Sequence, residues 1–312
     1  MHSLSYLARE VGVVSVNNLL VIGAFTNDIL PSGVSIGGSA YFIANSLAHL
    51  DSMLTIITNS YELMKVVKYA AYVSCVYAPK YGSVFVFEIR ESEESRKLKL
   101  IRKASSIDSL ITDLINEWID NGTRFRVAIV SPVFNEVSSE VVTELKKVAD
   151  YVIVDIQGFV RECESGNSCK IVVNEQRFYE LISIFSNSVD LIRGELLEFP
   201  KECRGDSIRK CVPGSVDVVQ TNGPNDMYIY LGKLGKVARL HPLPGIEGSS
   251  VGAGDVFTGV LAYFIAKGFD LLNSCARAAV AAGLKVGRAK VPWFTLPELE
   301  VLSHKVLKHI KF

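Results

Sequence analysis

Four consecutive residues, Gly252-Ala253-Gly254-Asp255, carry the most chemical information in this sequence, because they directly precede an apolar run that is typical of a buried helix. Glycines at a helix start let backbone N–H groups approach a ligand closely, and the positive end of the helix suits a phosphate or a developing anion. A carboxylate there is favoured in its charged form, so Asp255 could take the proton from an alcohol that attacks phosphorus. The pattern predicts phosphoryl transfer with an aspartate base, although a simple helix cap explains the same residues equally well.

Two other nucleotide-binding patterns are missing from the sequence. The segment nearest to a Walker phosphate loop, residues 232–236, has the wrong spacing and no following Ser or Thr. The first apolar run ends at Gly23 without the G-x-G-x-x-G of a dinucleotide-binding fold. We therefore expect neither P-loop chemistry nor hydride transfer.

The composition argues against nucleic acid and membrane partners. The 33 basic and 33 acidic residues give a net charge of zero, so the chain as a whole does not attract polyanions. No stretch of about 18 uncharged apolar residues occurs, and Arg9 and Glu10 interrupt the apolar N-terminus, so neither a membrane span nor a signal peptide is expected. We expect a cytoplasmic protein that binds a small molecule.

The elements that must position these residues alternate between strands and helices. The apolar run at 19–25 is typical of a strand buried on both faces, and residues 106–122 have the spacing of an amphipathic helix that ends at Gly122. Further segments predict strands at 125–131, 151–156, 189–192 and 216–221, and helices at 138–149 and 175–186. This alternation predicts an α/β fold with a mainly parallel sheet covered by helices.

Two segments break the alternation. Residues 83–90 with 97–102, and residues 227–232 with 236–241, are typical of antiparallel strands around a turn. We expect the first pair, which is rich in charge, to form a flap beside the main sheet.

The six cysteines lack the close paired spacing of a zinc site. We expect reduced structural thiols, with a disulfide between Cys203 and Cys211 as the alternative if the source is a hyperthermophile.

Taken together, these residues resemble the ribokinase-like carbohydrate kinase family, whose C-terminal signature is an Asp-x-Thr-Gly-Ala-Gly-Asp run leading into an apolar helix. The resemblance implies that Asp255 is the catalytic base and that Gly252, Ala253 and Gly254 form the anion hole for the transferred phosphoryl group. Thr221-Asn222-Gly223 is similar to the family's Thr-x-Gly, which implies that Thr221 and Gly223 bind the nucleotide phosphates together with Gly252 and Gly254. The implied fold is a single three-layer α/β/α domain over residues 1–312, with a small β-strand lid from about residues 28–38 and 83–102.

The family also carries an Asn-x-x-Glu motif that helps to organise magnesium through water, and Glu195-Leu196-Leu197-Glu198 corresponds to it. Glu198 matches the motif, whereas Glu195 replaces its Asn and is the weaker candidate. The resemblance implies ATP as donor and Mg²⁺ as cofactor. A solvated helix edge is the alternative interpretation of the two glutamates.

On the acceptor side, Asp28 resembles the family's hydroxyl-binding Asp, and Gly37-Gly38 with the downstream Asn45 resembles its substrate loop. The run from Val154 to Arg161 looks most like the myo-inositol kinase branch, where Gln157 stands in place of the Asn of other branches. The resemblance therefore implies a cyclic polyol as acceptor, with myo-inositol favoured, and the binding residues Asp28, Gly37, Gly38, Asn45, Gln157 and Arg161. Asn45 fits a helix-packing role better than a ligand role, and Gln157 and Arg161 could instead fasten a loop.

Two positions depart from the family signature. Ser249 replaces the leading Asp, which in the family contributes to a monovalent-cation site behind the anion hole, and Val251 replaces the Thr. The loss of that Asp argues against potassium activation.

Two alternatives stay open. A sugar or nucleoside kinase of the same fold is one, because neither the fold nor the anion hole identifies the acceptor. A non-catalytic sensor that binds nucleotide or polyol is the other, because Ser249, Val251 and Glu195 all differ from the family pattern. In this family a lid often mediates dimerisation, so a homodimer through the lid is a further expectation.

Overall fold

A large, mainly parallel sheet forms the centre of the computed structural model, which describes residues 18–47, 50, 52–63, 67, 73–91, 96–164 and 169–312. Within those residues the sheet has nine strands in the order β15-β14-β13-β12-β9-β8-β1-β4-β5. The seven from β13 to β5 are parallel, and β14 and β15 add an antiparallel edge. The strands are β1 (Asn18–Gly23), β4 (Met53–Ile57), β5 (Val73–Tyr77), β8 (Phe125–Ser131), β9 (Ala149–Asp155), β12 (Leu191–Glu195), β13 (Asp217–Thr221), β14 (Met227–Leu231) and β15 (Lys236–Leu240).

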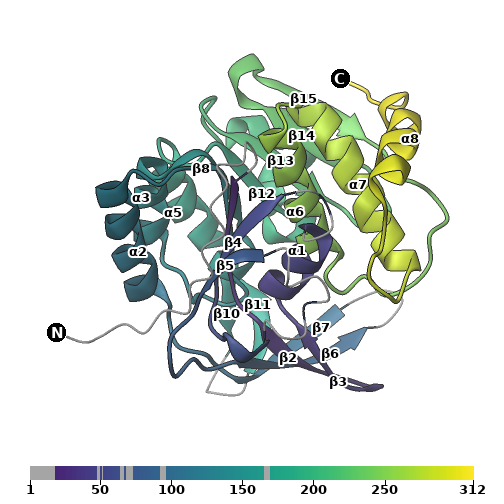
Figure 1. The fold of residues 1–312 in the computed structure, drawn as a ribbon. Helices are drawn as coiled ribbons and strands as arrows, with labels where there is room; N and C mark the ends of the chain where they lie inside the picture. The colour runs from purple at the N-terminus through teal and green to yellow at the C-terminus, as the bar shows by residue number, and fades with distance from the viewer. Residues whose placement is uncertain are drawn as a thin grey trace.

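Helices cover both faces of this sheet, with α2, α3 and α5 on one face and α1, α6 and α7 on the other (Figure 1). Leu19 and Val21 of β1 enter the core on the α6 side, whereas Leu20 and Ile22 enter the core on the α2 side. This alternation is expected for a strand buried on both faces, and it confirms the three-layer α/β/α prediction. The helices are α1 (Ser39–Leu47), α2 (Asp108–Asn121), α3 (Ser139–Glu144), α4 (Gln157–Val160), α5 (Glu175–Phe185), α6 (Ala253–Ala266), α7 (Leu271–Gly287) and α8 (Leu296–Leu307), with 3₁₀ turns η3 (Leu145–Lys147), η4 (Leu196–Glu198), η5 (Lys201–Cys203), η6 (Gly205–Lys210) and η7 (Gly232–Leu234). None of the described helices is both long enough and apolar enough to cross a membrane.

A second sheet forms the lid, which lies below the main sheet in Figure 1. In the described residues its strand order is β10-β11-β7-β6-β2-β3. The strands are β2 (Thr26–Leu30), β3 (Gly33–Gly37), β6 (Phe85–Glu91), β7 (Arg96–Arg102), β10 (Arg161–Cys163) and β11 (Cys169–Val173). The first four correspond to the lid strands expected from the sequence, whereas the short strands β10 and β11, of three and five residues, were not predicted.

Several predicted element boundaries differ from the structure, and for two of them the physical reason is clear. The helix predicted at 138–149 ends at Glu144 and continues only as the 3₁₀ turn η3, because Ala149 already pairs with Phe125 in the sheet. The strand predicted at 19–25 ends at Gly23, and the chain then turns into the lid, where the backbone N–H of Phe25 donates to Asn59 Oδ1 (2.8 Å).

Four of the cysteines form disulfides, so the expectation of reduced thiols was wrong for them. The alternative disulfide between Cys203 and Cys211 is present, and a second one joins Cys163 to Cys169. Their Cα atoms are 5.8 and 5.4 Å apart, which lies within the range that a disulfide can bridge. Cys75 and Cys275 are free thiols.

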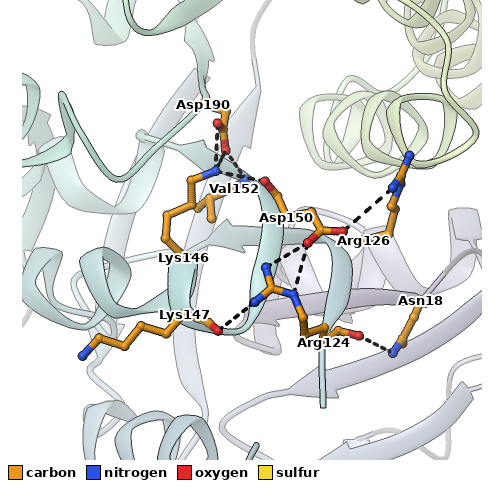
Figure 2. A network of polar contacts seen from close by, with 8 residues as sticks. All are labelled: Asn18, Arg124, Arg126, Lys146, Lys147, Asp150, Val152 and Asp190. Carbon is orange, nitrogen blue, oxygen red and sulfur yellow. Dashed lines mark hydrogen bonds and ion pairs between the residues drawn. The ribbon is translucent and has the colours of Figure 1, made fainter. Parts of the chain in front are cut away.

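A polar network ties the amino ends of the central strands together (Figure 2). Lys146 Nζ donates to both carboxylate oxygens of Asp190 (2.9 and 2.7 Å), and Asp190 Oδ2 also accepts the N–H of Val152 (2.7 Å). Beside this pair, Arg124 donates to Asp150 Oδ1 through Nε and one terminal nitrogen (3.2 and 2.9 Å). These contacts fix β8, β9 and β12 at one edge of the sheet, while the opposite, carboxyl edge stays available for a ligand.

Candidate active site

A cavity of about 570 Å³ lies between the lid and the carboxyl ends of the central strands. It brings together most of the residues that the sequence singled out, from both halves of the chain. Its lining includes Asp28, Gly38, Gln157, Arg161, Glu195, Thr221, Gly223, Gly252, Ala253, Gly254 and Asp255.

Three predicted site residues do not line this cavity. Gly37 lies beside it and leaves room for Asp28, since a Cβ on Gly37 would fall 2.0 Å from Asp28 Oδ2. Asn45 is 1% exposed within α1, and its Nδ2 donates to the carbonyl of Tyr41 (3.0 Å), which agrees with the helix-packing interpretation. Glu198 is buried behind Glu195.

The start of α6 has the geometry that the glycine spacing predicted. Gly252 is the residue before the helix and has a φ of 78°, in the left-handed region that favours glycine. Its Cα also faces the ring of Phe42, since a Cβ would fall 2.3 Å from that ring. The N–H groups of the first helical turn have no acceptor within the helix, and Asp255 belongs to this turn. The N–H of Ala253 donates to the carbonyl of Ser250 (3.0 Å) in the preceding loop. This end of the cavity can therefore accept an anion.

Arg193, which the sequence analysis missed, places a buried cation beside this helix start. One terminal nitrogen donates to Asp155 Oδ2 (2.8 Å) and the other to Thr221 Oγ1 (2.7 Å). The guanidinium also contacts the backbone at Gly254, since a Cβ there would lie 2.7 Å from it. Burial opposes its charge, but the carboxylates of Asp155, Glu198 and Asp255 raise the pKa of Arg193. The only sequence signal is an arginine inside an apolar strand run.

Asp155 holds several parts of the site in place. It is fully buried and accepts from Arg193, from Thr258 Oγ1 (3.2 Å) and from the N–H of Gln157 (3.1 Å). Through these bonds β9, β12, α4 and α6 are joined at one point. Arg161 is held in turn by a bond from its guanidinium to the carbonyl of Val133 (3.0 Å).

The acceptor end of the cavity combines polar walls with an apolar cover. Asp28 is 4% exposed, and its Oδ1 accepts the hydroxyl of Thr26 (2.7 Å). The lid strands β6 and β7 contribute Phe87, Ile89 and Leu98 to the lining. A polar ring compound with one C–H face fits such a site.

The two glutamates form a capping box at η4, in which Glu198 Oε2 accepts the N–H of Glu195 (2.7 Å). Burial and the neighbouring Asp155 raise the pKa of Glu198 to about 7, although Arg161 and Arg193 act in the opposite direction. Glu195 is exposed at the cavity. In the part of the chain that the structure describes, no three His, Cys, Asp or Glu residues cluster as a metal site. One accessible carboxylate backed by a second suits Mg²⁺ held through water and donor phosphates rather than by a full protein cage.

The opposite end of the cavity is apolar. Residues from the loop after β15 and from α7 form its walls, namely Pro242, Leu243, Ile246, Ala279, Ala282, Gly283 and Val286. A flat apolar group, such as a nucleobase, could be buried there next to the anion-binding helix start.

The sequence of the C-terminal part of the chain points to a family. Residues 193–291 match the sequence model of the pfkB family carbohydrate kinases. Over these residues the chain has the sequence pattern of a pfkB family carbohydrate kinase domain. The family match supports a phosphotransferase that acts on a sugar or polyol hydroxyl.

Solved structures agree with this assignment at the level of the fold. A pyrophosphate-dependent myo-inositol-1 kinase, changed into a myo-inositol-3 kinase by two substitutions, is 18% identical, with a TM-score of 0.69 over 93% of this chain and 99% of its own. Phosphofructokinase-2 from Escherichia coli in complex with potassium is 14% identical, with a TM-score of 0.66 over 94% of this chain and 99% of its own. A ribokinase from Thermotoga maritima is 15% identical, with a TM-score of 0.63 over 92% of this chain and 99% of its own. No curated protein sequence matches this chain significantly.

Proposed function

We propose that this pfkB domain transfers the γ-phosphoryl group of ATP, in the presence of magnesium, to a hydroxyl of a cyclic polyol, with myo-inositol as the favoured acceptor. One observation carries the proposal. The carboxylate of Asp255, the anion-accepting start of α6 and the polar groups Asp28, Gln157 and Arg161 line a single cavity.

In this proposal Asp255 acts as the general base. The acceptor hydroxyl oxygen forms a bond to the γ-phosphorus while the bond to the bridging oxygen breaks, ADP leaves, and the hydroxyl proton passes to the Asp255 carboxylate. The amides around Gly252, Ala253 and Gly254 stabilise the negative charge on the phosphoryl oxygens. Arg193 adds a fixed positive charge beside them. Magnesium, held through water by Glu195 and Glu198, would neutralise charge on the donor phosphates.

The polar groups at the acceptor end support a polyol. Asp28 can accept hydrogen bonds from two neighbouring hydroxyls, and Gln157 and Arg161 can donate to others. The apolar cover of Phe87, Ile89 and Leu98 suits the C–H face of a ring and excludes water, which otherwise would accept the phosphoryl group. A sugar kinase of the same fold is the nearest alternative, because sugars present the same groups.

The donor is the least constrained part of the proposal, and two observations point in different directions. The apolar end of the cavity could bind the nucleobase of ATP, whereas pyrophosphate has no apolar group that could bind there. In contrast, a structure that is 18% identical to this chain is a pyrophosphate-dependent kinase of the ribokinase family, complexed with a pyrophosphate analog and myo-inositol. Pyrophosphate is therefore the second candidate donor.

The deciding experiment crosses donors with acceptors. Phosphoryl transfer would be followed by ³¹P NMR with ATP, GTP or pyrophosphate, each with myo-inositol, other polyols, ribose, fructose or a nucleoside, in the presence and absence of magnesium. We expect magnesium-dependent transfer from ATP to myo-inositol. Transfer from pyrophosphate alone would refute the ATP assignment, transfer to another acceptor would refute the inositol assignment, and no transfer in any combination would favour a sensor.

The role of Asp255 has its own test. Asp255→Asn should lower kcat by about 100- to 10,000-fold, because the amide cannot take the proton, while the dissociation constant of the donor changes by less than about threefold. Asp120→Asn, an exposed aspartate on α2, serves as the matched control and should leave kcat unchanged. A kcat near the native value in Asp255→Asn would exclude Asp255 as the base.

A further inference from the structure

A buried lysine lies behind the loop that leads into α6. Lys285 belongs to α7 and is only 7% exposed. Its Nζ donates to the carbonyl of Ser249 (2.9 Å) and to the carbonyl of Val251. The same ammonium group lies 5.5 Å from the centre of the Phe42 ring, which packs against Gly252.

These two bonds fix the orientation of two peptide groups in the loop. In a planar trans peptide the C=O and the following N–H point in opposite directions. Holding the carbonyls of Ser249 and Val251 toward Lys285 therefore directs the N–H groups of Ser250 and Gly252 away from it. Ser250 and Gly252 both line the cavity, so the loop presents carbonyls to the lysine and amides to the ligand.

The charge of the lysine acts in the same direction as the amides. A buried cation is screened less by solvent and salt than an exposed one. The ammonium group polarises the two peptide groups and adds a positive potential to the side of the loop where an anion binds. The two hydrogen bonds from Lys285 to carbonyls of this loop distinguish it from a side chain that only fills space.

We propose that Lys285 is a positioning residue that orients and charges the anion hole from behind, a role that rests on the proposed phosphoryl transfer. Because its ammonium group already occupies the two carbonyls, a small cation has no place between them. The native protein should therefore turn over equally fast in potassium chloride and in tetramethylammonium chloride.

The first test compares Lys285→Met, which removes the charge but keeps the length, with Lys285→Ala, which also leaves a space. Both variants should lower kcat by about 10- to 100-fold, which is no larger than the usual effect of removing an anion-hole donor. Both should change the acceptor KM by less than about threefold. Ammonium or methylammonium ions should partly restore the kcat of Lys285→Ala, where they can enter the space that the side chain leaves. They should not restore the kcat of Lys285→Met, where the methionine side chain fills that space. Lys290→Met, at an exposed lysine five positions further on, is the control and should match the native protein.

Circular dichroism and thermal unfolding show whether the variants fold. A folded Lys285→Met with a kcat within twofold of native, or a Lys285→Ala that no small cation restores, would overturn the proposal. Failure of both variants to fold would also overturn it, since the lysine would then hold the fold as a whole rather than the loop.

A second readout separates this inference from the proposed function. Calorimetry measures the affinity for inorganic pyrophosphate, which needs no acceptor and no turnover. We expect an affinity at least about fivefold weaker in Lys285→Met than in Lys290→Met. If the native protein phosphorylates nothing but this difference remains, the proposed function is wrong and the role of Lys285 in anion binding stands; equal affinities would contradict the role itself.

Discussion

Arg193 is the residue whose position most changes the view of this site, because its charge is buried between a carboxylate, a hydroxyl and the anion-binding helix start. Asp155, its partner, has no exposed surface. Removing the cation alone would leave Asp155 as a buried charge, which usually costs about 3–5 kcal/mol of folding free energy.

We therefore expect Arg193→Met to lower the free energy of unfolding by about 3–5 kcal/mol in denaturant titrations. The double variant Arg193→Met/Asp155→Asn should recover part of this loss, since the buried position then carries no charge. A double variant no more stable than the single one would show that the cost lies in packing and not in the unpaired carboxylate.

Individual residues were predictable where local chain geometry determines them. Gly252 and Asp255 could be found because glycine spacing before an apolar helix is a local signal. Arg193, Asp155 and Lys285 could not be found, because the contacts that define their roles, Arg193 with Asp155 and Thr221 and Lys285 with the loop before α6, join residues at least 28 positions apart and depend on the fold. Asn45 shows the opposite case, in which a plausible ligand residue bonds within its own helix.

At the scale of elements, the N-terminal end of α8 is stabilised by one carboxylate, that of Glu298. Glu298 accepts from both terminal nitrogens of Arg288 (3.1 and 2.7 Å) and from the N–H of Thr295 (2.8 Å) in a capping box. The hydrogen bonds from Arg288 lower the pKa of Glu298 to about 2, although burial acts against them and Thr295 adds to them. Because the folded pKa is below the unfolded value, this stabilisation is present at neutral pH and is lost as the pH falls toward 2.

Glu298→Gln should lower the free energy of unfolding by about 1 kcal/mol at pH 7, the usual size for a helix cap in a partly exposed position. The difference from native should shrink as the pH is lowered from about 5 to about 2. Thermal unfolding across this pH range measures it. A difference that stays constant with pH would mean that the ionised carboxylate makes no contribution.

The accuracy of the element predictions follows the strength of the local pattern. β8 has the predicted bounds because it is a mostly apolar run. α2 ends at Asn121 with Gly122 as its C-cap, as predicted, because its apolar residues recur at helical spacing up to a clear cap signal. β10 and β11 were missed because they gain order from pairing with each other and with β7 and from a disulfide. Such pairing is tertiary information that strands of three and five residues do not encode.

At the scale of the whole molecule, the lid offers a surface for self-association. β3 is an edge strand of the lid sheet, and Val34 on it is 71% exposed. Unpaired strand edges with apolar side chains tend to pair with another chain. This arrangement supports the homodimer expected from the family resemblance.

We expect the native protein to be a dimer by light scattering at about 10 µM and Val34→Lys to be a monomer, because a lysine on an edge strand opposes pairing. Val301→Lys places the same change on an exposed valine of α8 and should leave the dimer intact. A native monomer, or equal dissociation by both variants, would show that the lid edge is not the interface.

The segment that matches the pfkB family, residues 193–291, contains the proposed base, the proposed anion hole and the apolar end of the cavity, whereas Asp28, Gln157, Arg161 and the lid lie outside it. The two halves of the cavity therefore come from separate stretches of the chain. Selection could replace the acceptor half while the transfer half stayed fixed. We expect a chimera that joins about the first 190 residues of a related sugar kinase to the C-terminal part of this chain to prefer the sugar of that kinase, because the residues that line the acceptor end would come from it.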